Sequence, residues 1–289
     1  MIRTFLIATA AVALAASAVA AAPKAKPAPA AAQPVGPATA DWRTPNPDDL
    51  LVIETNKGRV IVELAPDVAP AHVVRIRELA RAHFYDGQTF FRVVDRFMDQ
   101  TGDPTNTGTG GSDKPNLAAE FTFRRGAETP FVVAANQTVS EVGFVRSLPV
   151  TSQSSMLMPM TADGKVSAWA LYCPGVAGMA RDESPDGANS QFFLMRDGYP
   201  SLEKRYTAFG RVIAGQDVVR AIKVGEPVAP PQDRMEQVRL LSDLPEASRP
   251  KVRVIDPAGA WFKAEIERVR ATKGADFSAC DVQMPVEVK

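Results

Sequence analysis

The sequence is poor in the residues that most often carry metal or covalent chemistry. Among 289 residues there are two histidines, His72 and His83, and two cysteines, Cys173 and Cys280. Neither histidine has a second histidine, a cysteine or a carboxylate cluster at metal-ligand spacing, and no candidate nucleophile lies in a recognisable elbow motif. We therefore expect no metal site, no Ser-His triad and no organic cofactor, with both histidines at the surface or at the end of a helix.

An excess of charge of either sign is also missing. The chain has 33 basic and 33 acidic residues, and its sequence pI is about 6.8. Without a basic block, we expect no binding to nucleic acid or to an anionic membrane. The glycine-rich run 108–111 lacks the Gly-Lys-Ser/Thr ending and the helix of a phosphate loop, so it is interpreted as a flexible loop.

The first 46 residues have a composition unlike the rest. A charged start at Arg3 precedes an apolar, alanine-rich run over 5–20, which predicts a signal peptide over residues 1–21. This run is short for a membrane anchor, so no span is expected in the mature chain. Residues 22–46, rich in alanine and proline, are expected to form a disordered linker. The protein is thus predicted to be exported, to the periplasm, where Cys173 and Cys280 form a disulfide or remain two buried thiols.

Apolar periodicity predicts most of the elements between residues 51 and 241. Residues 51–55 and 59–64 are rich in β-branched side chains and are predicted to form two strands joined by a turn at 56–58. Residues 71–82 and 216–223 have the three- and four-residue apolar spacing of helices, and 236–241 fits a strand. Residues 90–101 have strand propensity, include Arg92 among large apolar side chains, and end at a turn at Gly102.

Four blocks, in this order, resemble cyclophilin-type peptidyl-prolyl isomerases. They are residues 90–103, 178–181 (Gly-Met-Ala-Arg), 189–194 (Asn-Ser-Gln-Phe-Phe-Leu) and 202–212. The resemblance spans about 47–243 and implies a mainly β fold: a closed, eight-stranded antiparallel barrel capped by the helices over 71–82 and 216–223. It also implies a substrate groove on the outer face of the barrel, flanked by the glycine-rich loop.

The resemblance implies an activity and a set of site residues. Rotation about an Xaa-Pro bond has a barrier of about 20 kcal/mol, and a catalyst needs only to bind the twisted amide better than the planar isomers. Arg92 would direct its guanidinium at the prolyl nitrogen and the adjacent carbonyl, with Gln100 holding it. The substrate-binding residues implied by the family are Phe97, Met98, Phe193 and Leu202 in the proline pocket, together with Ala180, Arg181, Gln191 and Tyr206.

Two positions depart from the family pattern. Phe91 stands where many members have histidine, and Ser201 stands where tryptophan is frequent, while Tyr206 occupies a position at which histidine or tyrosine is usual. We expect Ser201 to weaken binding of the inhibitor cyclosporin more than catalysis, because that tryptophan would contact bound ligand rather than the rotating bond.

Residues 124–174 form an insertion, and residues 244–289 form a C-terminal extension, relative to the family. In the insertion, the sequence predicts a strand over 130–134 and a hairpin formed by 156–161 and 165–172. Its row of Met156, Met158 and Met160 would pack on the barrel or offer an adaptable binding surface. In the extension, the sequence predicts a strand over 251–255 and a helix over about 257–273 that starts at Asp256-Pro257. That helix has an apolar stripe that docks within the chain or on a partner.

The function predicted from these features is isomerisation of Xaa-Pro bonds in unfolded or exported polypeptides during folding. The alternative is a catalytically weak chaperone or assembly module of the same fold, with its groove remodelled by the insertion. The sequence leaves the oligomeric state open.

Overall fold

The structure is a computed structural model that describes residues 36–289. The predicted signal peptide and the first part of the predicted linker lie outside this range. Within the described residues, no helix is long and apolar enough to cross a membrane.

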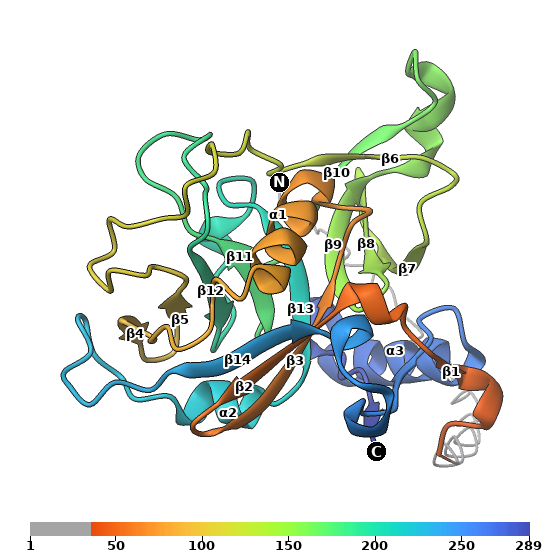
Figure 1. Cartoon of the computed structure of the whole chain (residues 1–289). Helices are drawn as coiled ribbons and strands as arrows, with labels where there is room; N and C mark the ends of the chain where they lie inside the picture. The colour runs from red at the N-terminus through yellow and green to blue at the C-terminus, as the bar shows by residue number, and fades with distance from the viewer. Residues whose placement is uncertain (1–35) are drawn as a thin grey trace, which may run out of the picture. The chain divides into compact units, whose positions relative to one another are not determined.

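Eight antiparallel strands form the largest sheet, in the order β14-β2-β3-β13-β11-β12-β5-β4 (Figure 1). Their bounds are β2 (Leu50–Thr55), β3 (Gly58–Leu64), β4 (Arg92–Val94), β5 (Met98–Thr101), β11 (Val176–Met179), β12 (Phe192–Met195), β13 (Ala208–Ala214) and β14 (Met235–Leu240). The predicted hairpin is confirmed, with Thr55 opposite Gly58 across the β2–β3 turn.

The two ends of this sheet meet without a continuous strand pair. Val93 and Gly225 exchange main-chain hydrogen bonds of 2.8 and 2.9 Å, and Phe90 donates to the carbonyl of Asp233 at 2.9 Å. These contacts belong to isolated bridges. Strands β4 and β14, the two edges of the sheet, do not pair with each other. The mainly β fold with helices is therefore confirmed, whereas the sheet is curled and the predicted closed barrel is not confirmed.

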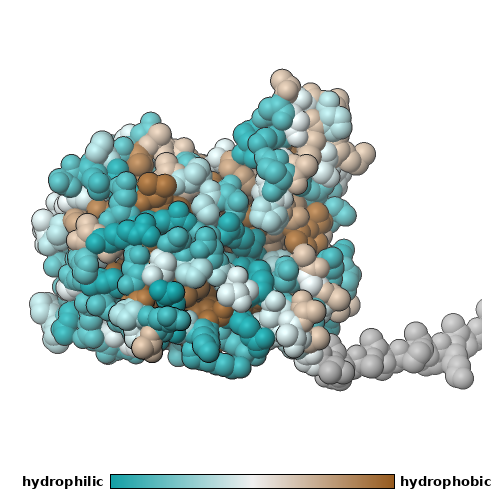
Figure 2. Space-filling view, turned by 45° about the vertical axis from the view of Figure 1, so that its right-hand side comes forward, coloured by the Kyte–Doolittle hydropathy of each residue, from teal (hydrophilic) through white to brown (hydrophobic). Residues whose placement is uncertain are grey.

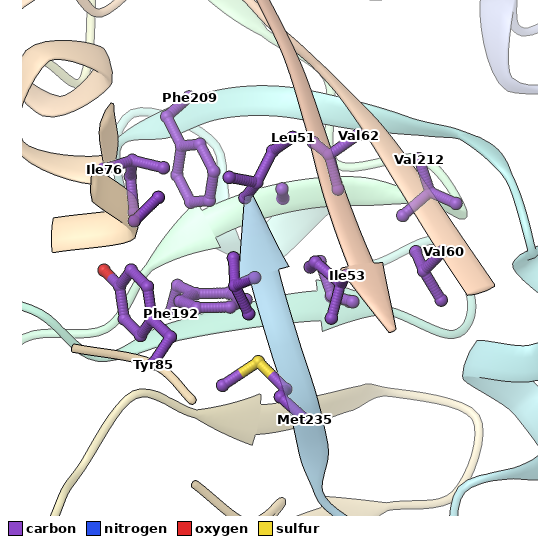
Figure 3. Packing of buried hydrophobic residues seen from close by; sticks show 14 of the residues in the cluster. Leu51, Ile53, Val60, Val62, Ile76, Tyr85, Phe192, Phe209, Val212 and Met235 are labelled. Carbon is purple, nitrogen blue, oxygen red and sulfur yellow. The ribbon is translucent and has the colours of Figure 1, made fainter. Parts of the chain in front are cut away.

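The main core lies between the inner face of this sheet and helix α1 (Pro70–Arg81), with α2 (Gln216–Ala221) against another part of the sheet. Figure 3 shows Leu51 and Ile53 of β2 pointing toward Ile76 of α1 and Phe192 of β12. All four side chains are fully buried. Burial of each is worth about 1.5 to 3 kcal/mol, which makes this cluster the main source of stability for the sheet that carries the site.

Strand β2 is apolar on both faces, and the second face is covered by the C-terminal extension. Leu50 and Val52 pack with Val252 and Val254, which belong to a three-stranded sheet. That sheet has the order β1 (Trp42–Arg43), β15 (Val252–Ile255), β16 (Val286–Val288). The predicted disordered linker is therefore wrong for its last residues, because Trp42 pairs with Ile255.

The insertion forms a separate antiparallel sheet in the order β6-β10-β9-β8-β7. Its strands are β6 (Phe123–Arg125), β7 (Phe131–Asn136), β8 (Ser140–Val145), β9 (Leu148–Gln153) and β10 (Val166–Ala170). The strand predicted at 130–134 is confirmed as part of β7.

The predicted hairpin over 156–172 is wrong. Residues Ser155–Met160 form a 3₁₀ helix, and β10 pairs with β6 and β9 instead. Ser154 caps this helix through the amide of Met156, and Pro159 removes a donor that a strand ladder would need. Met156 and Met160 are 84% and 81% exposed, so the methionine row does not pack against the main sheet.

Helix α3 (Ala260–Lys273) exists as predicted but begins later than Asp256-Pro257 indicated. The Asp256 carboxylate accepts a hydrogen bond from the amide of Ala258 in a preceding turn, and Asp41 accepts one from Trp261 at 3.0 Å in the first turn of α3. The predicted stripe is buried, with Phe262 edge-on to Phe144 of β8 at 5.2 Å between ring centroids. The helix thus docks within the chain, on the insertion.

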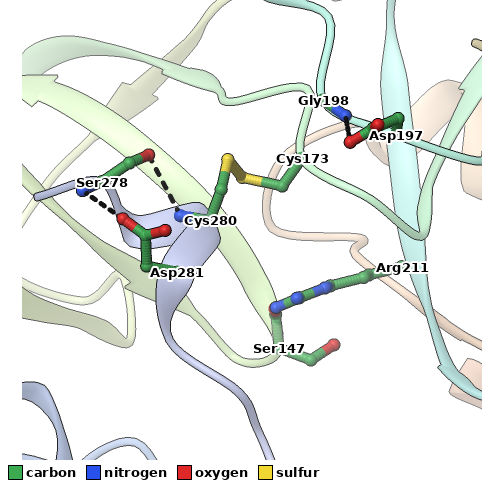
Figure 4. Close-up of a disulfide and its surroundings, with 8 residues drawn as sticks. All are labelled: Ser147, Cys173, Asp197, Gly198, Arg211, Ser278, Cys280 and Asp281. Atoms are coloured by element: carbon green, nitrogen blue, oxygen red, sulfur yellow. Dashed lines mark hydrogen bonds between the residues drawn. A yellow bond between two sulfur atoms is a disulfide. The ribbon is translucent and has the colours of Figure 1, made fainter. Parts of the chain in front are cut away.

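A disulfide joins Cys173 to Cys280 (Figure 4). It links the end of the insertion to the C-terminal tail, where Cys280 lies within the short helix Ala279–Asp281. Of the two states left open by the sequence, the structure has the bridged one.

Candidate active site

Three adjacent strands bring the predicted catalytic and pocket residues together. Arg92 of β4 lies opposite Gln100 of β5, and Gln100 lies opposite Phe193 of β12. Gly102 follows the last residue of β5 and has a φ of +89°. It lies so close to the segment before β12 that an added Cβ would be 2.5 Å from the carbonyl oxygen of Ser190. A glycine at the predicted turn is therefore needed both for its left-handed φ and for this close approach.

A chain of polar side chains runs from Arg92 to the glycine-rich loop. Arg92 Nη1 donates to Gln100 Oε1 at 3.2 Å, and Gln100 Nε2 donates to Gln191 Oε1 at 2.9 Å. Gln191 Nε2 in turn donates to the carbonyls of Gly108 and Gly110 at 3.0 and 2.8 Å. Each amide is thereby oriented by its neighbours, and the arginine fork is held at one end of the chain.

The glycine-rich loop is organised by one buried carboxylate. Asp103 Oδ1 accepts from the amide of Thr105 at 2.7 Å, and Oδ2 accepts from the amides of Gly108 and Gly110 at 2.6 and 3.1 Å. Burial acts to raise the pKa of Asp103, but hydrogen bonds from Thr105, Gly110 and Gly108 outweigh it and lower the pKa below its ordinary value. The loop is therefore wrapped around an ionised carboxylate.

An Asp103→Asn variant should lose about 1.5 to 3 kcal/mol of unfolding free energy at pH 7, because an amide cannot accept all of these bonds. Since the folded-state pKa is lowered, this stabilisation is complete above the unfolded-state pKa of about 3.9 and disappears as the pH falls through the folded-state value. Denaturant titrations at pH 7 and at a series of pH values below about 4 should show a difference from wild type that is largest at pH 7 and shrinks as the pH falls through the folded-state pKa. Asp113→Asn, at an exposed acid in the same loop, is the matched control, and an equal loss there would contradict the assignment.

The predicted proline-pocket residues form one apolar cluster. Met98, Phe193 and Leu202 are 2%, 5% and 8% exposed, and Phe97 is partly buried against them. The ring of Tyr206 meets Phe193 edge-on at 5.9 Å between centroids. On the other side, Phe193 stacks on Tyr172 at 6.1 Å, so the end of the insertion supports this cluster from behind.

The remaining predicted residues border a cavity of about 460 Å³ beside the polar chain. Its lining includes Gln100, Ala180, Arg181, Gln191 and the glycine-rich loop. The amide of Ala180 donates to the carbonyl of Gln191 at 2.9 Å. Arg181 stacks over Tyr206 at 4.8 Å and donates to the carbonyl of Arg205 at 3.1 Å.

The sequence reasoning did not identify two residues at this site. Glu226 Oε1 accepts from Arg92 Nε at 2.6 Å, and the ring of Tyr199 lies 4.4 Å from that of Phe97. Glu226 reaches Arg92 because Gly225 bridges to Val93, a long-range pairing without a local signal. Tyr199, two residues before Ser201, is 42% exposed and places an aromatic ring beside the pocket.

The two histidines lie at the ends of α1. His83 follows the helix and is exposed, as predicted. His72, in the first turn, is fully buried, and its Nδ1 has a partner there, Glu120 Oε2 at 2.6 Å. Glu120 also accepts from the amides of Ala71 and His72, so this pair anchors the start of the helix.

The curled, mainly β sheet with its helices is a cyclophilin fold, and Arg92 lies on its edge strand β4. The model of the cyclophilin-type peptidyl-prolyl cis-trans isomerase family matches residues 50–242. The chain therefore belongs to this family.

Relatives in bacteria agree with this assignment. A peptidyl-prolyl cis-trans isomerase of Brucella suis is 34% identical over 191 residues, which cover 62% of this chain and 74% of the relative. One of Staphylococcus saprophyticus is 30% identical, over 64% of this chain and 84% of the relative. The crystal structure of cyclophilin AquaCyp293 from Hirschia baltica has a TM-score of 0.78 and 34% identity, covering 86% of this chain and 93% of that one. This similarity extends beyond the part of the chain matched by the family model.

Proposed function

We propose that this protein catalyses cis-trans isomerisation of Xaa-Pro bonds in exported polypeptides. The observation that carries the proposal is the Arg92–Gln100 pair on neighbouring strands, with Phe193 next across the sheet. A guanidinium held by Gln100 thus lies on the same strands as an apolar cluster, and burial of a proline ring needs apolar surroundings.

The proposed mechanism uses no covalent step. When the amide twists, its nitrogen loses conjugation, becomes pyramidal and gains a lone pair that can accept a hydrogen bond. Arg92 would donate to this nitrogen and to the adjacent carbonyl, and Gln100 would fix the plane of the guanidinium. Because the planar isomers offer no such lone pair, these contacts bind the transition state more tightly than the ground state.

The remaining predicted residues would hold the polypeptide on either side of the rotating bond. Phe97, Met98, Phe193 and Leu202 would enclose the proline ring. Ala180, Arg181 and Gln191, around the adjoining cavity, would bind the residue before proline. Tyr206 would close one side of the pocket, and Tyr199 would supply the rim surface that Ser201 does not.

The ion pair between Arg92 and Glu226 competes with the substrate in this mechanism. Both side chains are exposed, at 39% and 56%, so the pair is worth about 0.2 to 1 kcal/mol and can open. A Glu226→Gln variant should therefore raise kcat/KM by up to about fivefold at low salt. The gain should vanish near 1 M salt, where charges are screened over about 3 Å.

Steady-state assays at two ionic strengths measure this effect. Glu236→Gln, which removes a comparably exposed partner of Arg234, should leave kcat/KM unchanged. A decrease in kcat/KM for Glu226→Gln would show instead that Glu226 positions Arg92 productively.

The rival function, a binding module without useful turnover, needs an insertion that covers the groove. The lining of the cavity beside Arg92 comes from residues 100–116 and 180–191, and none of it from 124–174. The insertion supports the apolar cluster from behind through Tyr172. Both observations favour an open groove and an enzyme.

The fold and cellular context are part of the same proposal. We take the curled sheet to act as a closed barrel, supported by the Val93–Gly225 and Phe90–Asp233 hydrogen bonds that link its ends. The disulfide is compatible with export to the periplasm, where unfolded proline-containing chains would be the clients.

The decisive experiment is a cis-to-trans assay of a short Xaa-Pro peptide with the mature protein, without reductant. The expected result is a concentration-dependent acceleration over the slow uncatalysed rate. Binding of an unfolded protein with no acceleration of the peptide would establish the rival function.

A further inference from the structure

A second cavity, of about 260 Å³, shares no lining residue with the cavity beside Gln100 and Gln191. It is lined by Arg211 and Arg220, from β13 and α2, by Ser147 from the β8–β9 turn, and by Cys280 and Gln283 of the C-terminal tail. It therefore lies where the main sheet, the insertion and the extension meet. Figure 4 shows Arg211 extending toward Ser147 beside the Cys173–Cys280 bridge.

Arg211 is a buried cation without a carboxylate partner. Arg211 is only 9% exposed. Within residues 36–289, its side chain makes one hydrogen bond, from Nη1 to the carbonyl of Ser147 at 3.0 Å. A guanidinium has five donors in a planar fork, so most of its capacity remains for a ligand. Removal from water lowers the pKa of Arg211 to about 10, so the group is still charged at neutral pH.

The surrounding charges do not neutralise Arg211. None of the residues that line the cavity is acidic. Glu63 lies opposite Arg211 in the β3–β13 ladder, but both of its oxygens accept from Arg43, at 2.5 and 2.8 Å. Asp281, next to Cys280, pairs with Lys273 at 2.9 Å. The cavity therefore has the positive charge of Arg211, and Arg220 adds a second cation.

We propose that this cavity is a binding site for a small oxyanion, of the phosphate or carboxylate type, held by the Arg211 fork. A planar guanidinium matches such a group through two parallel hydrogen bonds, and burial strengthens them. The ligand would touch the main sheet and the C-terminal tail at once. It would thus stabilise the docking of the extension rather than act on the substrate groove.

Inorganic phosphate is the first probe and acetate the second, with chloride at equal ionic strength as the reference. Isothermal titration should give saturable binding of one oxyanion per chain. At 100 times the Kd, Tm should rise by roughly 5 to 10 °C. The two oxyanions distinguish a phosphate-selective site from one that accepts carboxylates, and the absence of saturable binding by either would overturn the proposal.

Arg211→Met and Arg220→Gln are the informative variants. Arg211→Met should weaken binding at least about 30-fold, the effect of truncating one partner of a buried charge pair. Without oxyanion, it should be as stable as wild type or more stable, since it removes an unpaired buried charge. A purely structural Arg211 predicts the reverse, a loss of stability that phosphate does not affect.

The second variant keeps the proposal testable if the first fails to fold. Arg220 is exposed, so Arg220→Gln should fold and bind phosphate several-fold more weakly. Arg268→Gln, on the exposed face of α3, should bind as wild type does. Equal phosphate affinity in wild type and Arg220→Gln, together with no selectivity over chloride, would also overturn the site.

Discussion

An Arg92→Ala variant is expected to lose about 10²- to 10³-fold in kcat/KM for Xaa-Pro isomerisation, the effect of removing one donor aimed at a transition state. The loss should appear mainly in kcat, because Arg92 is not a member of the apolar cluster of Phe97, Met98 and their neighbours, which is proposed to bind the proline ring. Arg92→Lys should recover only a small part of the rate, since a lysine retains the charge but not the planar fork that Gln100 holds.

The same assay provides the controls for Arg92. Arg268→Ala removes an exposed arginine whose ion pair is with Glu265 on α3, and it should keep full activity. Circular dichroism and denaturation should show Arg92→Ala folded, because its ion pair with Glu226 is solvent-exposed. A folded Arg92→Ala variant with at least a fifth of the wild-type rate would refute a catalytic role for this residue.

The Cys173→Ser/Cys280→Ser double variant should lose about 3 to 5 kcal/mol of unfolding free energy. The bridge closes a loop with a sequence separation of 107 residues, and a loop of about 100 residues gives about 4.7 kcal/mol on the chain-entropy model. Denaturant titration measures the loss. Turnover per folded molecule should persist, because neither cysteine is among the residues proposed to contact the substrate.

Reduction supplies an independent test of the bridge. A reductant should lower the unfolding free energy of the wild type to that of the double variant and leave the double variant unchanged. Wild-type protein with equal stability in oxidised and reduced form would show that the extension is held by packing alone.

The parts of the fold that could be predicted are those with a local signal. The Thr55–Gly58 hairpin, the helix over 71–82 and the turn at Gly102 follow from propensity, apolar spacing and glycine. The site residues could be proposed because they belong to blocks of sequence that resemble a known family and follow one another in the order of that family. Their joint location fits the resemblance, whereas their catalytic roles await the Arg92 assay.

The parts that could not be predicted depend on contacts between distant segments. Glu226 meets Arg92 through the Val93–Gly225 bridge, and Asp41 meets the first turn of α3 although more than 200 residues separate them. At 156–160 the alternating methionines resemble a strand, but the Ser154 cap and Pro159 favour a 3₁₀ helix. For Glu226 and Asp41, no window of adjacent residues contains the partner. The 3₁₀ helix is the exception, because Ser154 and Pro159 are local signals that the alternation of the methionines concealed.

The pairing of Trp42 with Ile255 has a consequence for the order of folding. Because a chain is synthesised from its N-terminus, β1 is made early and β15 almost last, so the sheet that covers the second face of β2 cannot form until synthesis is nearly complete. Leu50 and Val52 remain uncovered during that interval. An unfinished chain therefore exposes two apolar side chains of β2 that the complete protein buries.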